Sequence, residues 1–552
     1  MAGRAVEHNV ARYLRAHAIA TPDAPALMVP EKPWRVDQLQ WTCSSFSELD
    51  QRSDAIADLL QRTGVKQGER AVVLVPPSLD LYATLFGLFK LGVIPVLLDP
   101  GMGPRALLSC IERTAPTVMV ADPRVHALST VVRRPFSTVR VRVTAGRRWF
   151  WGGVSLRAAS WNAPEPRPLT AVAKEDTAAI LFTSGSTGPA KGVLTRHGML
   201  SSQVEALQEM FDFQPGWTDL QAFAGFALFD ICLGMCAALA PMNLSRPASA
   251  DPKTMLAAHA ALKPEVAFGS PIVWQRMSRL GAPGETPLTH LRVPLTVGAP
   301  IPAYLHHRLR AMMGEGREIY TPYGATESLP VTWIGTEEIL SDTWPKTAQG
   351  HGTCVGRLAP SIRVRIITIG DEPIASWRDD LEMEAGAIGE VVVSGPQASV
   401  AYADAPEANA KSKIREGDTV WHRMGDLGYL DAKGRLWFCG RKAHRLETEN
   451  GMIPAVPVEG IFNEHPAIFR SACVGVGPRG AQRPVLVVEL EPGTTWRVEM
   501  QDELLAMTSG TRFDGLFDRV LVHDGFPTDA RHNSKIRRED IAPWAADQLG
   551  VQ

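Results

Sequence analysis

A run of hydroxyl side chains, glycines and one lysine extends from Thr183 to Gly192, directly after an apolar stretch that ends at Phe182. Small residues let backbone N–H groups approach an anion closely, hydroxyl groups add hydrogen-bond donors, and Lys191 supplies a positive charge. The segment, TSGSTGPAKG, is therefore predicted to hold a polyphosphate, although the Walker spacing is absent. The alternative is a flexible surface loop, which accounts for the three glycines but not for the four hydroxyl groups and the lysine.

Five other segments carry groups that suit a nucleotide: Gly298–Pro300, Tyr323–Glu327, Gly425–Tyr429, Arg441 and Lys535. The first offers bare backbone to a flat ring, and the second combines an aromatic ring, a glycine, a hydroxyl and a carboxylate. A carboxylate near phosphates is suited to Mg²⁺, which prefers oxygen ligands. We expect the third segment to place Asp426 on a tight turn, where its carboxylate accepts hydrogen bonds from a ribose diol. Taken singly, each has an ordinary alternative as a turn residue or a solvated charge.

Apolar periodicity predicts the elements that must position these segments. Arg70–Val75 and Val93–Leu98 have the length and composition of strands, and Ser78–Leu91 has helical apolar spacing. Strand, helix and strand in close succession predict a βαβ unit, so we expect an α/β body with parallel strands. The same alternation is expected at 265–269 with a helix after Pro271, and at 295–297 with a helix at 304–312.

The remainder of the chain divides into a β-rich section and a second body. Strands are expected at Val364–Ile369 and Gly389–Ser394 without an intervening helix, and they close the first body. After Gly440 a new α+β pattern begins. We therefore predict a large ATP- and acyl-substrate-binding domain at 1–441 and a small, mobile α+β domain at 442–552 that carries Lys535.

Composition limits the class of protein. The 552 residues include 57 Lys and Arg against 59 Asp and Glu, and this net charge of −2 argues against a general nucleic-acid binder. The seven cysteines are scattered singly without a zinc-binding pattern, which fits a reducing cytoplasm. No signal peptide is visible in the first thirty residues. We expect a cytoplasmic protein.

The most apolar stretch, Ala222–Leu244, is long enough to span a membrane and contains Asp230 as its only charge. Gly225, Asp230, Gly234 and Pro241 interrupt it, so we expect a buried strand and a buried helix instead of a transmembrane segment.

A second unusual stretch runs from Pro123 to Pro164, which contains eight arginines, no acidic residue and the sequence RRWFW at Arg147–Trp151. Basic residues beside Trp and Phe suit a membrane-surface contact or a partner interface. The alternative is a solvated insertion with arginines lying around a small aromatic cluster. The sequence favours the insertion, because no amphipathic helix of useful length is visible there.

Read together, these motifs resemble the adenylate-forming superfamily of acyl-CoA synthetases, luciferases and adenylation domains. The matching segments, in order, are TSGSTGPAKG at 183–192, YGATE at 323–327, GDLGYLD at 425–431, GRK at 440–442 and the late Lys535. The resemblance covers nearly the whole chain. It implies that a carboxylate attacks the α-phosphorus of ATP, and that pyrophosphate leaves.

The resemblance also implies a role for each matching residue. The ATP phosphates would be held by Thr183, Ser184, Gly185, Ser186, Thr187, Gly188 and Lys191. Adenine would lie against Gly298, Ala299, Pro300, Tyr323 and Gly324. Thr326 would contact the α-phosphate, Glu327 the Mg²⁺ ion, and Asp426 the ribose, with Arg441 near the ribose or the phosphate. Lys535 would bridge the carboxylate and the ribose side of the adenylate.

Two departures from the common pattern concern the second half of the reaction. The hinge position that usually carries Asp or Lys is Ala443, and the usual Ser-Gly-Lys loop is replaced by Asn533-Ser534-Lys535. These variants resemble the β-lactone synthetases of bacterial olefin biosynthesis. Such enzymes activate a long-chain 2-alkyl-3-hydroxy acid, whose own hydroxyl group then closes a four-membered lactone. The resemblance further implies association with neighbouring enzymes of that pathway.

Three alternatives are weighed at this point. A fatty acyl-CoA or acyl-AMP ligase would pass the acyl group to a thiol instead. A catalytically inactive adenylate-binding scaffold is disfavoured, because the chain keeps Lys191, Glu327, Asp426 and Lys535. A membrane-associated interaction protein built on the basic aromatic segment would bind liposomes, and mutating Arg147, Arg148, Trp149 and Trp151 would abolish that binding.

The acyl substrate is expected to contact Phe226, Phe229, Asp230 and Gly269. Alkyl chains need an apolar lining, which the phenylalanines supply. Asp230 is predicted to orient or deprotonate the substrate's β-hydroxyl group. The alternative is a buried Asp that backbone donors satisfy, or one that caps the following helix.

Overall fold

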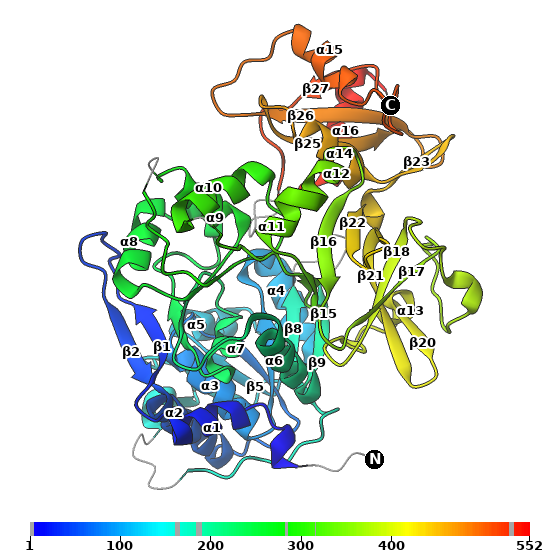
Figure 1. The fold of residues 1–552 in the computed structure, drawn as a ribbon. Coiled ribbons are helices and arrows are strands. Elements are labelled where there is room, and N and C mark those ends of the chain that lie inside the picture. Colours follow the sequence, from blue (N-terminus) through cyan, green and yellow to red (C-terminus); the bar gives the residue numbers. More distant parts are fainter. Residues whose placement is uncertain are drawn as a thin grey trace.

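The computed structural model describes residues 5–159, 166–183, 190–281, 285–314, 316–528 and 535–551. Two large sheets and their helices form the N-terminal body, a third sheet follows, and a small α+β section lies beyond it (Figure 1). The mixed α/β class with a large body and a small C-terminal section is as predicted.

The first sheet has eight strands in the order β19-β9-β8-β4-β3-β5-β6-β7. Its strands are β3 Arg70–Leu74, β4 Ile94–Leu98, β5 Val118–Ala121, β6 Val141–Thr144, β7 Val154–Ser155, β8 Thr177–Thr183, β9 Lys191–Arg196 and β19 Tyr402–Ala403. Strands β3 and β4 pair in parallel around the helix α3 Leu79–Lys90, which confirms the predicted βαβ unit. Its remaining helices are α4 Pro104–Thr114, α5 Pro123–Val131 and α6 His197–Phe211.

The helix starts of this body follow from local capping chemistry. The Ser78 hydroxyl accepts a hydrogen bond from the backbone of Leu81 at the start of α3. Asp122 accepts two backbone hydrogen bonds at the start of α5. The long helix α2 Phe46–Arg62 begins with a capping box made by Ser45 and Glu48. It follows the N-terminal helix α1 Arg12–Ala20.

The second sheet has six strands in the order β13-β12-β10-β11-β1-β2. They are β1 Pro25–Pro30, β2 Trp41–Ser45, β10 Thr218–Gln221, β11 Cys236–Leu239, β12 Val266–Gly269 and β13 Val293–Thr296. The helices of this sheet are α7 Ala227–Cys232, α8 Pro252–Leu262, α9 Pro271–Ser278 and α10 Ala303–Met313. The apolar stretch at 222–244 is thus the short helix α7 followed by the central strand β11, both buried as predicted.

The third sheet is the predicted β-rich section and is mostly antiparallel, in the order β14-β15-β16-β22-β21-β18-β17, with β20 against β21. Its strands are β14 Tyr323–Ala325, β15 Ser328–Trp333, β16 Thr353–Leu358, β17 Arg363–Ile367, β18 Gly389–Ser394, β20 Lys413–Glu416, β21 Thr419–Leu430 and β22 Leu436–Arg441. Its short helices are α11 Thr336–Glu338, α12 Trp344–Thr347 and α13 Pro406–Ser412.

The C-terminal section lies beyond the ends of β16 and β22 (Figure 1, orange to red). It comprises β23 Leu446–Thr448, β24 Gly451–Ile453, α14 Ala455–Phe462, β25 Ile468–Val476, β26 Arg483–Leu490, α15 Glu499–Ala506, β27 Val520–Val522 and α16 Arg538–Leu549. It touches the rest of the protein through few polar contacts. The indole of Trp344 donates to Glu464 at 2.9 Å, and Arg445 pairs with Asp371 at 2.7 Å.

The basic segment at 123–164 is not the solvated insertion that the sequence favoured. Its described part contains α5, β6 and the edge strand β7, so it belongs to the first sheet. The expected aromatic cluster is present around Trp151.

Candidate active site

Asp426 lies at the centre of a buried polar group that three strands build. The register of β21 and β22 places Asp426 opposite Arg441, and Arg441 Nη1 lies 2.8 Å from Asp426 Oδ1. Tyr323, from β14, donates its hydroxyl hydrogen to Asp426 Oδ2 at 2.5 Å. The motifs that contain Tyr323, Asp426 and Arg441 are separate in the sequence, and they thus converge on one carboxylate.

The expectation that Asp426 lies on a tight turn is wrong. Strand pairing continues from Thr419 to Leu430, and Asp426 lies inside that strand. Gly425 takes a φ of +69°, and the register shifts between Leu427 and Gly428, so the glycines here bend a strand instead of reversing it.

Burial and the neighbouring groups act on the pKa of Asp426 in opposite directions. Burial raises the pKa of Asp426, while Arg441, the Tyr323 hydroxyl and Lys535 each lower it. Lys535 therefore lies within electrostatic reach of this carboxylate. Burial, followed by the charge of Asp426, raises the pKa of Tyr323 well above its ordinary value, so Tyr323 stays a hydrogen-bond donor. Asp426 Oδ1 is buried without an aligned hydrogen bond from any described residue, which leaves an acceptor for a ligand hydroxyl group.

A second polar group surrounds Tyr402, beside the first. The Tyr402 hydroxyl donates to Glu327 Oε1 at 2.7 Å, and the ammonium groups of Lys191 and Lys413 lie 5.2 and 5.3 Å from the centre of its ring. The charge of Glu327 also acts on Lys413, so the two side chains lie within electrostatic reach of each other. A carboxylate beside expected phosphate contacts suits a hard divalent cation.

The remaining nucleotide segments lie at strand ends. Gly298, Ala299 and Pro300 follow β13, and Gly298 has a φ of +106°, which favours glycine. At Gly324 in β14, a Cβ atom would lie 2.6 Å from the carbonyl oxygen of Ser328. Thr326 is half-buried in the turn between β14 and β15.

The phosphate segment is described only at its two ends. Thr183 closes β8, and Lys191 opens β9 opposite it in the antiparallel register. The predicted phosphate contacts Ser184, Gly185, Ser186, Thr187 and Gly188 lie outside the described residues, as do Asn533 and Ser534 before Lys535.

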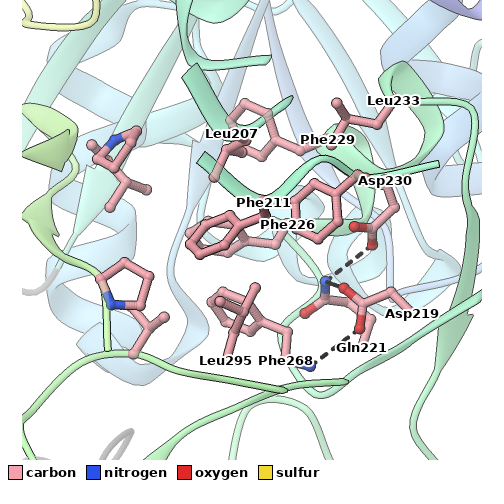
Figure 2. A pocket seen from close by; sticks show the side chains of 15 residues that line it. Leu207, Phe211, Asp219, Gln221, Phe226, Phe229, Asp230, Leu233, Phe268 and Leu295 are labelled. Atoms are coloured by element: carbon pink, nitrogen blue, oxygen red, sulfur yellow. Dashed lines mark hydrogen bonds between the residues drawn. The ribbon is translucent and has the colours of Figure 1, made fainter. Parts of the chain in front are cut away.

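An apolar cavity lies between α6, α7 and the second sheet (Figure 2). Its cavity volume in this structure is about 30 Å³. Phe226 stacks on Phe268 with ring centres 4.3 Å apart, and Phe229 packs against Phe226 at 5.7 Å. The lining is completed by residues from several elements: Leu207, Phe211, Phe213, Leu233, Leu295, Val297, Pro322, Leu329 and Pro330. Gly269 is not part of the lining. A Cβ atom at Gly269 would point at the Trp274 indole, whereas the side chain of its neighbour Phe268 lines the cavity.

One side of this cavity is polar. Gln221 Nε2 donates to Asp230 Oδ2 at 3.0 Å and to Asp219 Oδ2 at 3.1 Å (Figure 2). Asp219 also accepts a hydrogen bond from the backbone of Phe268. Burial raises the pKa of Asp219 to about 7 and raises that of Asp230 well above its ordinary value, with the charge of Asp219 adding to the second shift. Two adjacent buried carboxyl groups do not both ionise, so the pair holds one proton at neutral pH.

The cavity adjoins the nucleotide segments. Val297 precedes Gly298, and Pro322 precedes Tyr323, so two lining residues are the direct chain neighbours of expected adenine contacts. An acid whose alkyl part occupies the cavity would therefore present its carboxylate toward the ATP side.

A model of the AMP-binding enzyme family matches residues 14–403. The chain belongs to the AMP-binding enzyme family. It is 41% identical over 549 residues to an olefin β-lactone synthetase of Xanthomonas campestris, with 98% of each chain covered. It is 42% identical to an olefin β-lactone synthetase of Stenotrophomonas maltophilia over the same share. The fold is similar to that of an amide bond synthetase from Marinactinospora thermotolerans, with a TM-score of 0.78, 21% identity and 98% and 100% of the two chains covered.

Four residues of this AMP-binding enzyme's site were not predicted: Asp219, Gln221, Tyr402 and Lys413. Asp219 and Gln221 are two positions apart on β10 and therefore share a face of the sheet, a pattern that the sequence does display. Tyr402 and Lys413 carry no such pattern, because they reach Glu327 only through the packing of β19 and β20.

Lys413 is buried, and its ammonium donates to the carbonyl oxygen of Ser399 at 2.5 Å. Burial lowers the pKa of Lys413 to about 7, since the charge of Glu327 opposes this effect only in part and Lys191 adds to it.

In the part of the chain that the structure describes, no helix is long and apolar enough to cross a membrane, and no cluster of three His, Cys, Asp or Glu residues suits a metal ion.

Proposed function

We propose that this protein activates a long-chain 2-alkyl-3-hydroxy acid with ATP and then closes it to a β-lactone, with release of pyrophosphate and AMP. The observation that carries this proposal is the similarity to two olefin β-lactone synthetases over 98% of the chain. The lining of the cavity supports it, because the walls are apolar and one side offers hydrogen-bonding partners for a hydroxyl group. A long alkyl chain would have to part these walls, since the cavity volume is about 30 Å³.

In the first step, a carboxylate oxygen of the acid attacks the α-phosphorus of ATP, and pyrophosphate leaves. Lys191 would hold the departing phosphates, and Lys535 would offset the repulsion between the carboxylate and the α-phosphate. Asp426 would accept hydrogen bonds from the ribose hydroxyl groups, with Tyr323 and Arg441 fixing its orientation. Glu327 is the carboxylate that would hold Mg²⁺, which when bound balances the charge of the phosphates.

In the second step, the β-hydroxyl oxygen attacks the activated carbonyl carbon, the carbon–oxygen bond to the phosphate breaks, and AMP leaves. The hydroxyl proton needs an acceptor. We assign this role to the Asp219–Asp230 pair, whose single shared proton leaves one carboxylate able to take another. Gln221 would hold the two carboxyl groups in place through its two hydrogen bonds.

The division of the chain after Arg441 belongs to the same proposal. Strand β22 ends at Arg441, and Lys442 is fixed to the third sheet by Glu390 at 3.0 Å. Residues 442–552 would form the small domain that brings Lys535 to the site. Ala443, in the exposed turn that follows, replaces the charged hinge residue of thiol-acylating relatives. An internal nucleophile removes the need for a thiol to enter.

We also propose a cytoplasmic location, in keeping with seven cysteines that form no disulfide. A water-insoluble lactone would be passed to neighbouring enzymes of olefin formation, which favours association with them.

The test is incubation of the full-length protein with ATP, Mg²⁺ and a synthetic 2-alkyl-3-hydroxy fatty acid, without CoA. Lactone detected by NMR in an amount equal to AMP is the expected result. Absence of lactone, together with AMP release that requires CoA and accepts a plain fatty acid, would assign the protein to the thioester-forming ligases instead.

A further inference from the structure

Four consecutive residues, Arg147 to Phe150, are exposed at the edge of the first sheet. Two of them are aromatic: Trp149 is 54% exposed and Phe150 is 75% exposed. Large aromatic side chains in water are unfavourable unless they serve a contact. The adenylation and cyclisation chemistry uses neither of them.

The loop that carries these residues is held in a fixed shape. Trp151 is buried, donates its indole hydrogen to Thr144 Oγ1 at 2.9 Å and stacks on His126 of α5. Trp149 and Phe150 both pack against Trp151, with ring centres 5.4 and 5.2 Å away. The buried Trp151 therefore holds the exposed rings of Trp149 and Phe150 in place.

The two ends of the loop are also fixed. Gly153 has a φ of +96°, and a Cβ atom there would lie 2.2 Å from the carbonyl oxygen of Arg142. Arg148 donates to the carbonyl oxygen of Gly153 at 2.6 Å, and Ser155 donates to that of Gly146 at 2.8 Å. Only glycine fits at position 153, so the loop needs a glycine there to take this shape.

The segment that carries the loop is rich in positive charge, and the nearest acid along the chain is Asp122, which caps the start of α5. Residues 123–164 contain no Asp or Glu. Arg124, Arg147 and Arg157 are exposed and form no ion pair with any described carboxylate, whereas Arg134 and Arg140 pair with Glu112 and Glu69. Helix α5, which contacts the loop through His126, adds exposed aliphatic side chains: Leu128 and Val131.

We propose that the loop 146–153 and helix α5 form a docking surface for an anionic phospholipid bilayer. Trp and Phe rings lie well at the boundary between headgroups and acyl chains, and arginines contact lipid phosphates. An unpaired positive surface on a chain of net charge −2 is complementary to the negative surface of such a bilayer. A protein partner would have to offer a matching acidic face, and charged residues are normally depleted in the core of protein interfaces.

The test is co-sedimentation of the full-length protein with vesicles of phosphatidylglycerol and phosphatidylcholine, compared with vesicles of phosphatidylcholine alone. We expect binding to the anionic vesicles that falls as salt rises. The double variant Trp149→Ser/Phe150→Ser and the double variant Arg124→Gln/Arg147→Gln should each lose tenfold or more in vesicle affinity. Arg148 is left unchanged, because its side chain holds the loop.

The matched control is the double variant Ile19→Ser/Val498→Ser, which removes two aliphatic side chains that are 74% and 80% exposed elsewhere. It should bind vesicles like the unchanged protein. Melting temperature and ATP–pyrophosphate exchange, which involve no vesicles, would show that every variant is folded. The proposal is overturned if the unchanged protein does not bind anionic vesicles at low salt, or if the loop variants bind vesicles like the control. It is also overturned if the loop variants keep vesicle binding and lose only the binding of a protein partner. None of these outcomes bears on lactone formation.

Discussion

The nucleotide side and the acyl cavity of this enzyme are built in opposite ways. On the nucleotide side, Asp426 is paired with Arg441 and Tyr323 from neighbouring strands, so opposite charges and donors are already matched. In the cavity, Asp219 and Asp230 face each other beside phenylalanines, and burial with their mutual repulsion keeps a proton on the pair. The first arrangement keeps its groups in fixed protonation states, whereas the second holds a proton that can move. Under the proposed function, binding and phosphoryl chemistry belong to the first region and proton transfer to the second.

The largest effect is expected for Lys535→Ala, on the nucleotide side. Loss of one preorganised positive charge at the reacting phosphorus should slow adenylation by roughly two to three orders of magnitude. ATP–pyrophosphate exchange measures this directly. Lys66→Ala, which changes an exposed lysine, should exchange at the unchanged rate. Equal rates for both variants would remove Lys535 from the first step.

A smaller effect is expected for Tyr323→Phe. The variant keeps the ring but removes the hydrogen bond to Asp426, and a hydrogen bond to a charged group contributes about 1.5–3 kcal/mol. We expect the KM for ATP to rise roughly tenfold in steady-state assays, with kcat changed much less. Tyr304→Phe, at a partly exposed hydroxyl bonded to Gln275, serves as the control. A change confined to kcat would mean that Tyr323 does not act through nucleotide binding.

These two regions also differ in how far the sequence predicts them. Asp426, Arg441, Tyr323 and Lys535 were each chosen from short motifs, and the structure places Tyr323 and Arg441 against the Asp426 carboxylate. Their predicted roles toward ATP stay predictions. The tight turn predicted at Asp426 was wrong, because a glycine in a strand and a glycine in a turn look alike without the pairing partner. The βαβ unit and most later strands were located within a few residues by apolar periodicity.

The cavity was predicted only in part, because it depends on packing between distant elements. Phe226, Phe229 and Asp230 were expected, and they line it. Asp219 was missed, because its alternation with Gln221 on β10 shows a shared face of the sheet but not that this face meets Asp230. Gly269 was chosen from a turn signal, but its neighbour Phe268 faces the cavity instead.

The smallest effect concerns Lys413, whose pKa burial lowers to about 7. Because its folded pKa lies below its unfolded value, the unfolded state binds more protons between these two values, and stability should rise as the pH rises from about 7 toward 10. In Lys413→Met this contribution disappears. We expect the difference in melting temperature, unchanged protein minus variant, to increase over that range.

Lys411→Met, at an exposed lysine on the same segment, is the control for this titration. Its melting temperature should follow that of the unchanged protein at every pH. A constant difference between the Lys413→Met variant and the unchanged protein would show that Lys413 does not titrate in this window.

The most direct test of the division between the two regions is Asp230→Asn, assayed for two products in parallel. The account predicts that ATP–pyrophosphate exchange stays within a few-fold of the unchanged rate, while lactone formation falls by about two orders of magnitude and acyl-adenylate accumulates. Asp418→Asn, at an exposed acid, should leave both activities intact. Equal losses of exchange and lactone, or lactone formation at the unchanged rate, would contradict the assignment of proton transfer to the cavity.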